Sequence, residues 1–352
     1  MLPAFTREQN DILWALGQRM LHESDREAYL ARLRQECDRW QIGLVFMEQE
    51  AYPPILRQIQ DPPPVLFYRG NLSLAYRTGI AIVGTRRTTA YGEKAAYEIA
   101  ACCAKAGLIV VSGMARGIDS CAHKGALDAG GDTIALMPTG LDLCYPPANN
   151  WLYDRIISRS LALSEYPPGV KAEKWFFLGR NRLISGLSLA TVVVQAGGRS
   201  GAVNTAQHAA EQGRDLYAVP GSIFEFASVG THRLIADGAE LVNSVHMVAD
   251  RYKDRQMSLD EMAAGGEPRR ITIHQDIPQD EAAKERADEG SRASKTAGEW
   301  QWLYEAIDDF GSLAEQLVEK TGESPQRIQT GLTILEMRGL TERRDRQKIY
   351  RK

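Results

Sequence analysis

The sequence has few cysteines, and none of them stands at a spacing that binds metals. Its five cysteines are an odd number and include no CxxC pair, so we expect free thiols rather than a disulfide framework or a metal site. The sequence also lacks an apolar run of membrane-spanning length, and its N-terminus lacks the basic and then apolar segments of a signal peptide. These absences predict a cytoplasmic protein with no membrane contact.

The sequence also lacks an excess of positive charge, since its 42 lysines and arginines stand against 45 aspartates and glutamates and the formal net charge is −3 at pH 7. A protein that binds nucleic acid over much of its surface needs an excess of lysine and arginine. A nucleic-acid site in this chain must therefore concentrate its basic residues locally. Hydrophobic residues make up 44% and charged residues 25% of the 352 residues, which is an ordinary globular composition with room for one large domain and one or two small ones.

The centre of the sequence alternates between strand and helix patterns. The stretch from Gly79 to Asp119 contains a β-branched run, an alanine-rich helical segment and a second apolar run, which is the pattern of a β–α–β unit. Further apolar runs of strand length lie at residues 133–137, 161–163, 189–194 and 216–219. The alternation predicts an α/β fold with a doubly wound, mostly parallel sheet.

Three glycine-bearing segments follow these predicted strands, namely GTRRTTAYG, SGMARGID and AGGRSGAVNTA. In a parallel sheet all three lie at one edge, where backbone N–H groups and helix N-termini favour an anion. The first segment does not fit GxGxxG, and no segment fits GxxxxGK[ST]. These mismatches exclude the dinucleotide fingerprint and the ATPase phosphate loop, and we expect no cofactor.

Arginines accompany the three loops: Arg86 and Arg87 in the first, Arg116 in the second and Arg199 in the third. Arginine binds phosphate through two hydrogen bonds and stacks on bases. Residues 171–188, KAEKWFFLGRNRLISGLS, place further basic residues beside aromatic ones. A single-stranded nucleic-acid site needs cations that follow the backbone and flat rings that accept bases. The sequence therefore predicts that one nucleic-acid strand binds along the sheet edge.

Residues 1–70 are predicted to form a helical N-terminal module and a connector. Thr6 with Gln9 and Ser24 with Glu27 have the capping-box spacing, so each pair is expected to open a helix. The proline-rich connector excludes a regular helix, while its residues 65–68 fit an edge strand.

The remaining chain is predicted to contain three more parts. Residues 71–252 form the α/β domain, and residues 253–298 have the charged, aromatic-free composition of a flexible linker. Residues 299–352 show two short helical patterns, the second opened by Ser324 and Pro325, and then a basic hairpin-like tail. This order is typical of a winged helix, for which we expect an accessory contact to DNA or protein.

Several motifs between Tyr52 and Val242 carry a family resemblance: GTRRTTAYG, SGMARGIDSCAHKGAL, GGDTIALMPTGLDLCYPPAN, SEYPPG, RNRLISGLS, RSGAVNTAQHAAEQGRDLYAVPG and GTHRLIADGAELV. Through them the chain resembles the DprA family, also called Smf, of DNA-processing proteins in bacterial transformation. The resemblance implies an extended Rossmann-like domain that binds single-stranded DNA, protects it after uptake and helps to load the RecA recombinase. It also implies a homodimer that is not an enzyme.

The resemblance further implies which residues contact DNA, and it implies no catalytic residue. Matched by motif position, these residues are Gly84, Thr85, Arg86, Gly113, Ala115, Arg116, Gly117, Lys174, Phe177, Arg180, Asn181, Arg182, Arg199, Ser200 and Gly201. The trio at 180–182 is not expected in the core, because charged residues are seldom buried without a partner. The chain departs from the family pattern at Thr85, at the Leu178–Gly179 pair, which makes the direction of Phe177 less certain, and at Gln195.

Two other classes of function stay open at this stage. A phosphoribohydrolase would need an acidic residue soon after the glycine pair of the third loop, and the sequence offers none before Glu211. Cys121 and His123 are close in sequence, but a helix puts Cys121 on another face, which argues against a nucleophile–base pair. A winged-helix transcription regulator is disfavoured because the loops are rich in arginine rather than shaped for a small substrate.

Overall fold

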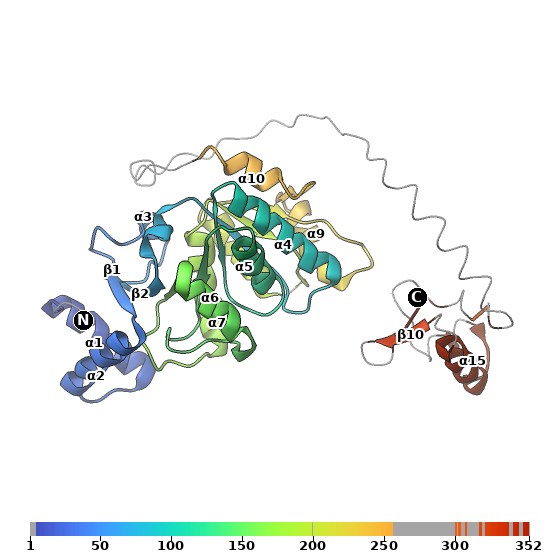
Figure 1. Cartoon of the computed structure of the whole chain (residues 1–352), viewed down its shortest axis with the longest axis horizontal. Coiled ribbons are helices and arrows are strands. Elements are labelled where there is room, and N and C mark those ends of the chain that lie inside the picture. The colour runs from blue at the N-terminus through green and yellow to red at the C-terminus, as the bar shows by residue number, and fades with distance from the viewer. Residues whose placement is uncertain are drawn as a thin grey trace. The chain divides into compact units, whose positions relative to one another are not determined.

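A computed structural model describes residues 5–255 apart from Arg199, and in the C-terminal part residues 300, 302–303, 307, 317–318, 321–337, 341–344 and 348–351 (Figure 1). The chain forms two compact units, Met1–Arg269 and Arg270–Lys352. The predicted linker lies outside the described residues from position 256 onward.

The first unit is built on a nine-stranded sheet with the order β1-β2-β6-β5-β4-β3-β7-β8-β9. Neighbours from β6 to β9 are parallel, whereas β2 is antiparallel to both β1 and β6. The strands are β1 (Gly43–Phe46), β2 (Val65–Gly70), β3 (Gly79–Val83), β4 (Ile109–Ser112), β5 (Thr133–Leu136), β6 (Leu161–Ser164), β7 (Ala190–Val193), β8 (Asp215–Ala218) and β9 (Glu240–Leu241). The prediction of an α/β fold with a mostly parallel sheet is therefore confirmed.

Helices cover both faces of this sheet, because alternate strand residues point to opposite sides and are apolar on both. One face packs through Ile80 and Ile82, and the other through Ala81 and Val83. The first face carries α1 (Arg7–Leu21), α2 (Arg26–Trp40), α4 (Ala90–Lys105), α5 (Ile118–Asp128), α6 (Asn150–Arg159) and α10 (Met247–Tyr252). The second face carries α3 (Pro54–Arg57), α7 (Lys174–Gly186), α8 (Gly201–Glu211) and α9 (Val229–Ala236). Short 3-10 helices lie at η1 (Leu72–Tyr76), η2 (Pro147–Asn149) and η3 (Phe226–Ser228).

The N-terminal module differs from its prediction in two details. Thr6 caps α1 with the expected capping box, but α2 is capped by Asp25, whose carboxylate accepts a hydrogen bond from the Ala28 N–H at 3.1 Å. The predicted edge strand at residues 65–68 is an interior strand, β2, and the edge is β1. The run GLVF of β1 is too short to be told from the apolar face of the preceding helix by its periodicity.

The described part of the second unit contains a helix and a hairpin. Helix α15 (Pro325–Met337) precedes β10 (Thr341–Arg344) and β11 (Lys348–Arg351), which pair antiparallel. Its core contains Trp300, Leu303, Ile307, Leu317, Ile328, Leu332 and Leu335. The first predicted helix of the winged helix, which opens at Ser312, begins outside the described residues. No helix of the described ranges is long and apolar enough to cross a bilayer.

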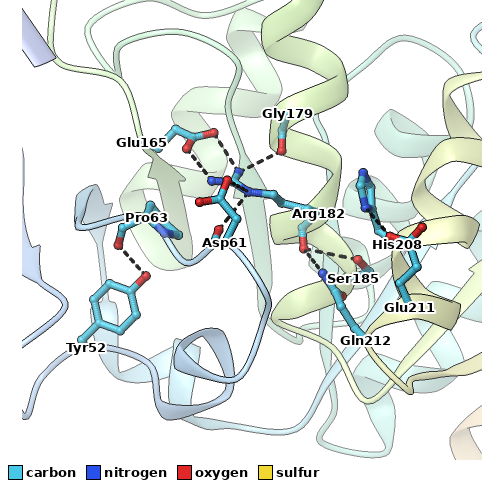
Figure 2. A network of polar contacts seen from close by, with 10 residues as sticks. All are labelled: Tyr52, Asp61, Pro63, Glu165, Gly179, Arg182, Ser185, His208, Glu211 and Gln212. Atoms are coloured by element: carbon cyan, nitrogen blue, oxygen red, sulfur yellow. Dashed lines mark hydrogen bonds and ion pairs between the residues drawn. The ribbon is translucent and has the colours of Figure 1, made fainter.

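Arg182 fastens α7 to the end of β6 and to the connector (Figure 2). Its two terminal nitrogens donate to the two carboxylate oxygens of Glu165 at 3.1 and 2.9 Å, and its Nε donates to the Asp61 carbonyl at 3.0 Å. Gln212 donates to the Arg182 carbonyl at 2.9 Å, which ties α7 to the end of α8. The Arg182 and Glu165 side chains are only 13% and 17% exposed, so water replaces few of these contacts if one partner is lost.

We expect Glu165→Gln to lower the free energy of unfolding by about 1–3 kcal/mol, because it removes the mostly buried charged partner of a mostly buried guanidinium and leaves only the exposed Asp61. Asp61→Asn is the matched control: Asp61 pairs with the same Arg182 but is 82% exposed, and its loss should cost less than about 0.5 kcal/mol. Denaturant unfolding measures both variants. Equal effects would show that the Glu165 pair does not clamp α7.

His123 of α5 is a second polar group in the core, and it is completely buried. Its Nδ1 lies 2.7 Å from the Thr133 hydroxyl, which itself donates to the Val110 carbonyl, so Nδ1 carries a proton and donates to Thr133. Burial, together with the positive charge of Arg180, lowers the pKa of His123 to about 3. An unfolded histidine titrates near pH 6.5. Between about pH 3 and pH 6.5, the unfolded chain therefore binds a proton at His123 that the folded chain does not bind.

The stability that His123 contributes is complete above about pH 6.5 and should fall by about 1.4 kcal/mol per pH unit below it, until the folded pKa is reached. His123→Gln removes this titration, so the variant should lose less stability than the wild type between pH 7 and pH 4, whatever its stability at pH 7. Denaturant unfolding at several pH values measures the two slopes. Parallel profiles would contradict the assignment of a neutral, buried His123.

Candidate nucleic-acid interface

Three strand-end loops interlock at the carboxyl edge of the sheet. They are residues 84–89 after β3, residues 113–117 after β4 and residues 194–200 after β7, called the first, second and third loops below. The Thr85 N–H donates to the Gln195 carbonyl at 2.7 Å, and the Thr85 carbonyl accepts from the Ile118 N–H at 3.3 Å. The Gln195 side chain also exchanges hydrogen bonds with Thr89. The loops therefore meet at one site, as the parallel order of their strands requires.

Two of the predicted site glycines let the loops approach this closely. A Cβ on Gly84 would lie 2.5 Å from the Ile118 side chain and 2.9 Å from the Gln195 carbonyl. Gly117 has a φ of +82°, and a Cβ there would lie 2.5 Å from the Thr85 carbonyl. Glycine is the residue that tolerates both the close approach and the positive φ. These two residues shape the site through the packing of its loops.

A pocket of about 630 Å³ opens above the interlocked loops. Its wall combines residues of the first, second and third loops with residues of α7 and the start of α8. The predicted site residues that line it are Gly84, Thr85, Arg86, Ala115, Lys174, Phe177, Arg180, Asn181, Ser200 and Gly201. Segments more than a hundred residues apart in sequence thus contribute to one concave surface.

The rim of the pocket pairs a cation with aromatic rings. The exposed Arg86 guanidinium lies over the Phe177 ring, 4.7 Å from its centroid. Tyr145, which the sequence did not single out, packs edge-on against Phe177 with the ring centroids 5.4 Å apart. Leu178 also lines the pocket and is 52% exposed. The Leu178–Gly179 departure therefore leaves Phe177 directed into the pocket, because α7 runs through this pair without a break.

Arg180 forms the floor of the pocket, and this corrects the expectation that it lies outside the core. Its side chain is buried, with 3% exposed, and Nη1 donates to the carbonyls of Gly113 and Leu136. The buried Asp119 carboxyl also lines the pocket. Burial raises the pKa of Asp119 while the charge of Arg180 opposes that rise, and burial lowers the pKa of Arg180 to about 10. Backbone carbonyls and one carboxyl thus keep a guanidinium in the core.

The N-terminus of α8 faces the same pocket. Ser200 caps this helix by accepting from the Val203 N–H, and Ser200, Gly201 and Ala202 line the pocket. Asn181 of α7, which is also buried rather than exposed, donates to the Gly201 carbonyl at 3.2 Å and holds the two helices together. Free N–H groups and the helix dipole make such an N-terminus favourable for phosphate.

The other predicted site residues lie away from the pocket lining. Gly113 sits beneath Arg180, and a Cβ there would meet the guanidinium at 2.5 Å. Arg182 is held by Glu165 and Asp61 as described above. Arg116 is exposed in the second loop, next to Ala115 of the pocket wall. Arg199 lies outside the described residues.

The histidine and cysteine that the sequence raised as a nucleophile–base pair do not form one. His123 forms a hydrogen bond with Thr133 in the core and does not line the pocket. Cys121 is half-buried, and burial raises the pKa of its thiol, which disfavours the reactive thiolate.

The DNA recombination-mediator protein A family matches residues 43–253 of this chain. Among similar proteins, DNA processing protein DprA of Streptococcus pneumoniae is 45% identical over 195 residues, which are 55% of this chain and 69% of that protein. The DprA protein of Bacillus subtilis is 38% identical over 221 residues, 62% of this chain and 74% of that protein.

Solved structures agree with these matches. The Streptococcus pneumoniae DprA structure superposes with a TM-score of 0.59 and 37% identity, covering 67% of this chain and 84% of that one. A Helicobacter pylori DprA structure, solved to describe the single-stranded DNA binding mode of that protein, gives a TM-score of 0.56 and 31% identity, covering 62% of this chain and 98% of that one. The family is one of recombination mediators and not of enzymes, and this chain belongs to the DNA recombination-mediator protein A family.

Proposed function

We propose that the pocket binds a single strand of DNA as part of a recombination-mediator function. The observation that carries this proposal is the convergence of Arg86, Lys174, Phe177 and the N-terminus of α8 on one concave surface. Arginine, lysine and the helix N-terminus supply partners for phosphate, and Phe177 supplies a face for a base. These are the two kinds of contact that an unpaired strand offers together.

The shape of the site favours a single strand over a duplex. In a duplex the bases are stacked and paired inside the helix, so a ring in a pocket cannot reach their faces without unstacking them. A single strand presents its bases freely, and stacking on aromatic rings tolerates every base. The single-stranded DNA binding of the Helicobacter pylori relative supports the same choice.

The remaining steps of the proposal rest on family membership. We propose that the chain acts in the cytoplasm as a homodimer, protects incoming single strands during natural transformation and loads RecA onto them. Sedimentation tests the dimer, and the rate of RecA filament assembly on single-stranded DNA, with and without this protein, tests the loading.

We also keep the predicted domain organisation as a proposal, with a Rossmann-like DNA-binding domain at residues 71–252, a flexible linker at 253–298 and a winged helix at 299–352. Helix α15 followed by the β10–β11 hairpin supports the last of these. We propose that this unit makes an accessory contact to DNA or protein.

Arg86→Ala should weaken binding of a fluorescent oligo-dT by about 10-fold or more, because a charge-assisted contact to phosphate is lost. The slope of log K against log salt should become shallower by about 0.7, the value for one phosphate contact in a single strand. Arg87→Ala is the matched control, since Arg87 is exposed in the same loop but does not line the pocket.

Fluorescence anisotropy over a salt series measures both quantities for both variants. Equal losses in the two variants would show that general charge, and not the pocket, binds the strand. Unchanged binding in Arg86→Ala would remove the pocket from the proposed function.

A further inference from the structure

An exposed arginine, Arg116, and an exposed tryptophan, Trp151, lie outside the pocket lining, near the starts of α5 and α6. The pocket lining includes Ala115 and Tyr145 but stops before the exposed Arg116. Arg116 is therefore exposed outside the pocket lining, next in the chain to Ala115 of the pocket wall.

The loop that carries Tyr145 is fastened directly to the loop that carries Arg116. The Asn149 amide donates to the Met114 carbonyl at 2.8 Å and to the Ser120 hydroxyl at 2.9 Å, and Asn149 is buried. Ser120 in turn donates to the Ala115 carbonyl. These bonds hold the segment between β5 and α6 against both sides of Arg116, so its position does not depend on a mobile loop.

Trp151 follows Asn149 by two residues, in the first turn of α6, and is 51% exposed. Arg155, one turn further along α6, donates to Asp128 of α5 at 2.8 Å. Residues four apart share one side of a helix, so Trp151 lies on the side of α6 that faces α5. The bond between Asn149 and Ser120 places this end of α6 beside the first turn of α5, the turn that follows Arg116.

We propose that Arg116 and Trp151 form an extension of the DNA site, in which Arg116 binds a phosphate and the indole of Trp151 stacks on a base of the strand that leaves the pocket past Tyr145. This inference rests on the proposed single-strand function and adds the direction in which the DNA strand leaves the pocket. Asp154, exposed one turn after Trp151, repels a further phosphate.

The charges of nearby residues favour the α5–α6 side of the sheet edge, rather than the side after β8, as the path of the strand. The segment after β8 also exposes large apolar side chains, with Ile223 at 79%, Phe224 at 72% and Phe226 at 76% exposed. Glu225 stands between the two phenylalanines, however, and would repel the backbone of a strand that stacks on them. The α5–α6 side instead offers the exposed Arg116 just before α5 and the exposed Trp151 in the first turn of α6, two helix ends that the Asn149–Ser120 hydrogen bond holds together.

The test compares two strands of equal length, oligo-dT and an abasic sugar–phosphate strand, using the full chain. Trp151→Ala should weaken binding of oligo-dT by about 5- to 10-fold and leave binding of the abasic strand unchanged, because stacking requires a base. Arg116→Ala should weaken both strands alike, since it removes a phosphate contact. Trp151→Phe, which keeps a flat ring, should restore most of the binding to oligo-dT.

Phe224→Ala is the control for the opposite side and should bind both strands as the wild type does. A loss that is equal on the two strands in Trp151→Ala, or no loss on oligo-dT, would overturn the extension. A base-dependent loss in Phe224→Ala with none in Trp151→Ala would place the strand on the other side and overturn it equally. Failure of the wild type to bind oligo-dT would instead contradict the proposed function itself, so the two failures are distinguishable. Thermal unfolding midpoints confirm that each variant is folded.

Discussion

The hydrogen bond from the Thr85 N–H to the Gln195 carbonyl is the contact on which the site depends. It joins the end of β3 to the end of β7, and the Thr85 carbonyl extends the connection to the start of α5. The Thr85 N–H and the Ile118 N–H are used in these contacts and are not free to donate to a ligand. The candidate binding groups are side chains and a helix end that line the pocket around the interlocked loops: Arg86, Lys174, Phe177 and the start of α8.

The positive charge of the site is divided between a rigid and an adaptable part. Arg180 is buried, donates to two backbone carbonyls and supports the pocket from beneath. Arg86 and Lys174 are exposed and can follow the position of a phosphate. Arg182 supports the site indirectly, because its ion pair with Glu165 fixes the helix that carries Lys174 and Phe177. Four basic residues that look equivalent in the sequence thus have different physical roles.

The sequence was sufficient for the features that periodicity and motif spacing record. Alternating apolar runs predicted the parallel strands, and the glycine-bearing junctions predicted which loops meet. The sequence did not show which individual polar residues are buried. The trio at 180–182 looks like a surface patch, yet Arg180 is buried because the carbonyls of residues 113 and 136 converge on it. Tyr145 was missed for a related reason, since its contact with Phe177 depends on a loop whose position Asn149 fixes through tertiary hydrogen bonds.

The order of strands in the sheet also bears on how the chain folds as it is synthesised. Strand β2 leaves the ribosome long before β6, its antiparallel partner, and β3 long before β7. Until those partners exist, the N-terminal strands expose unpaired backbone edges, which are templates for aggregation. The early antiparallel pairing of β1 with β2 and the capped helices α1 and α2 satisfy part of that backbone locally. The N-terminal module can thus pair one edge of β2 before the central strands are complete, while the other edge of β2 waits for β6.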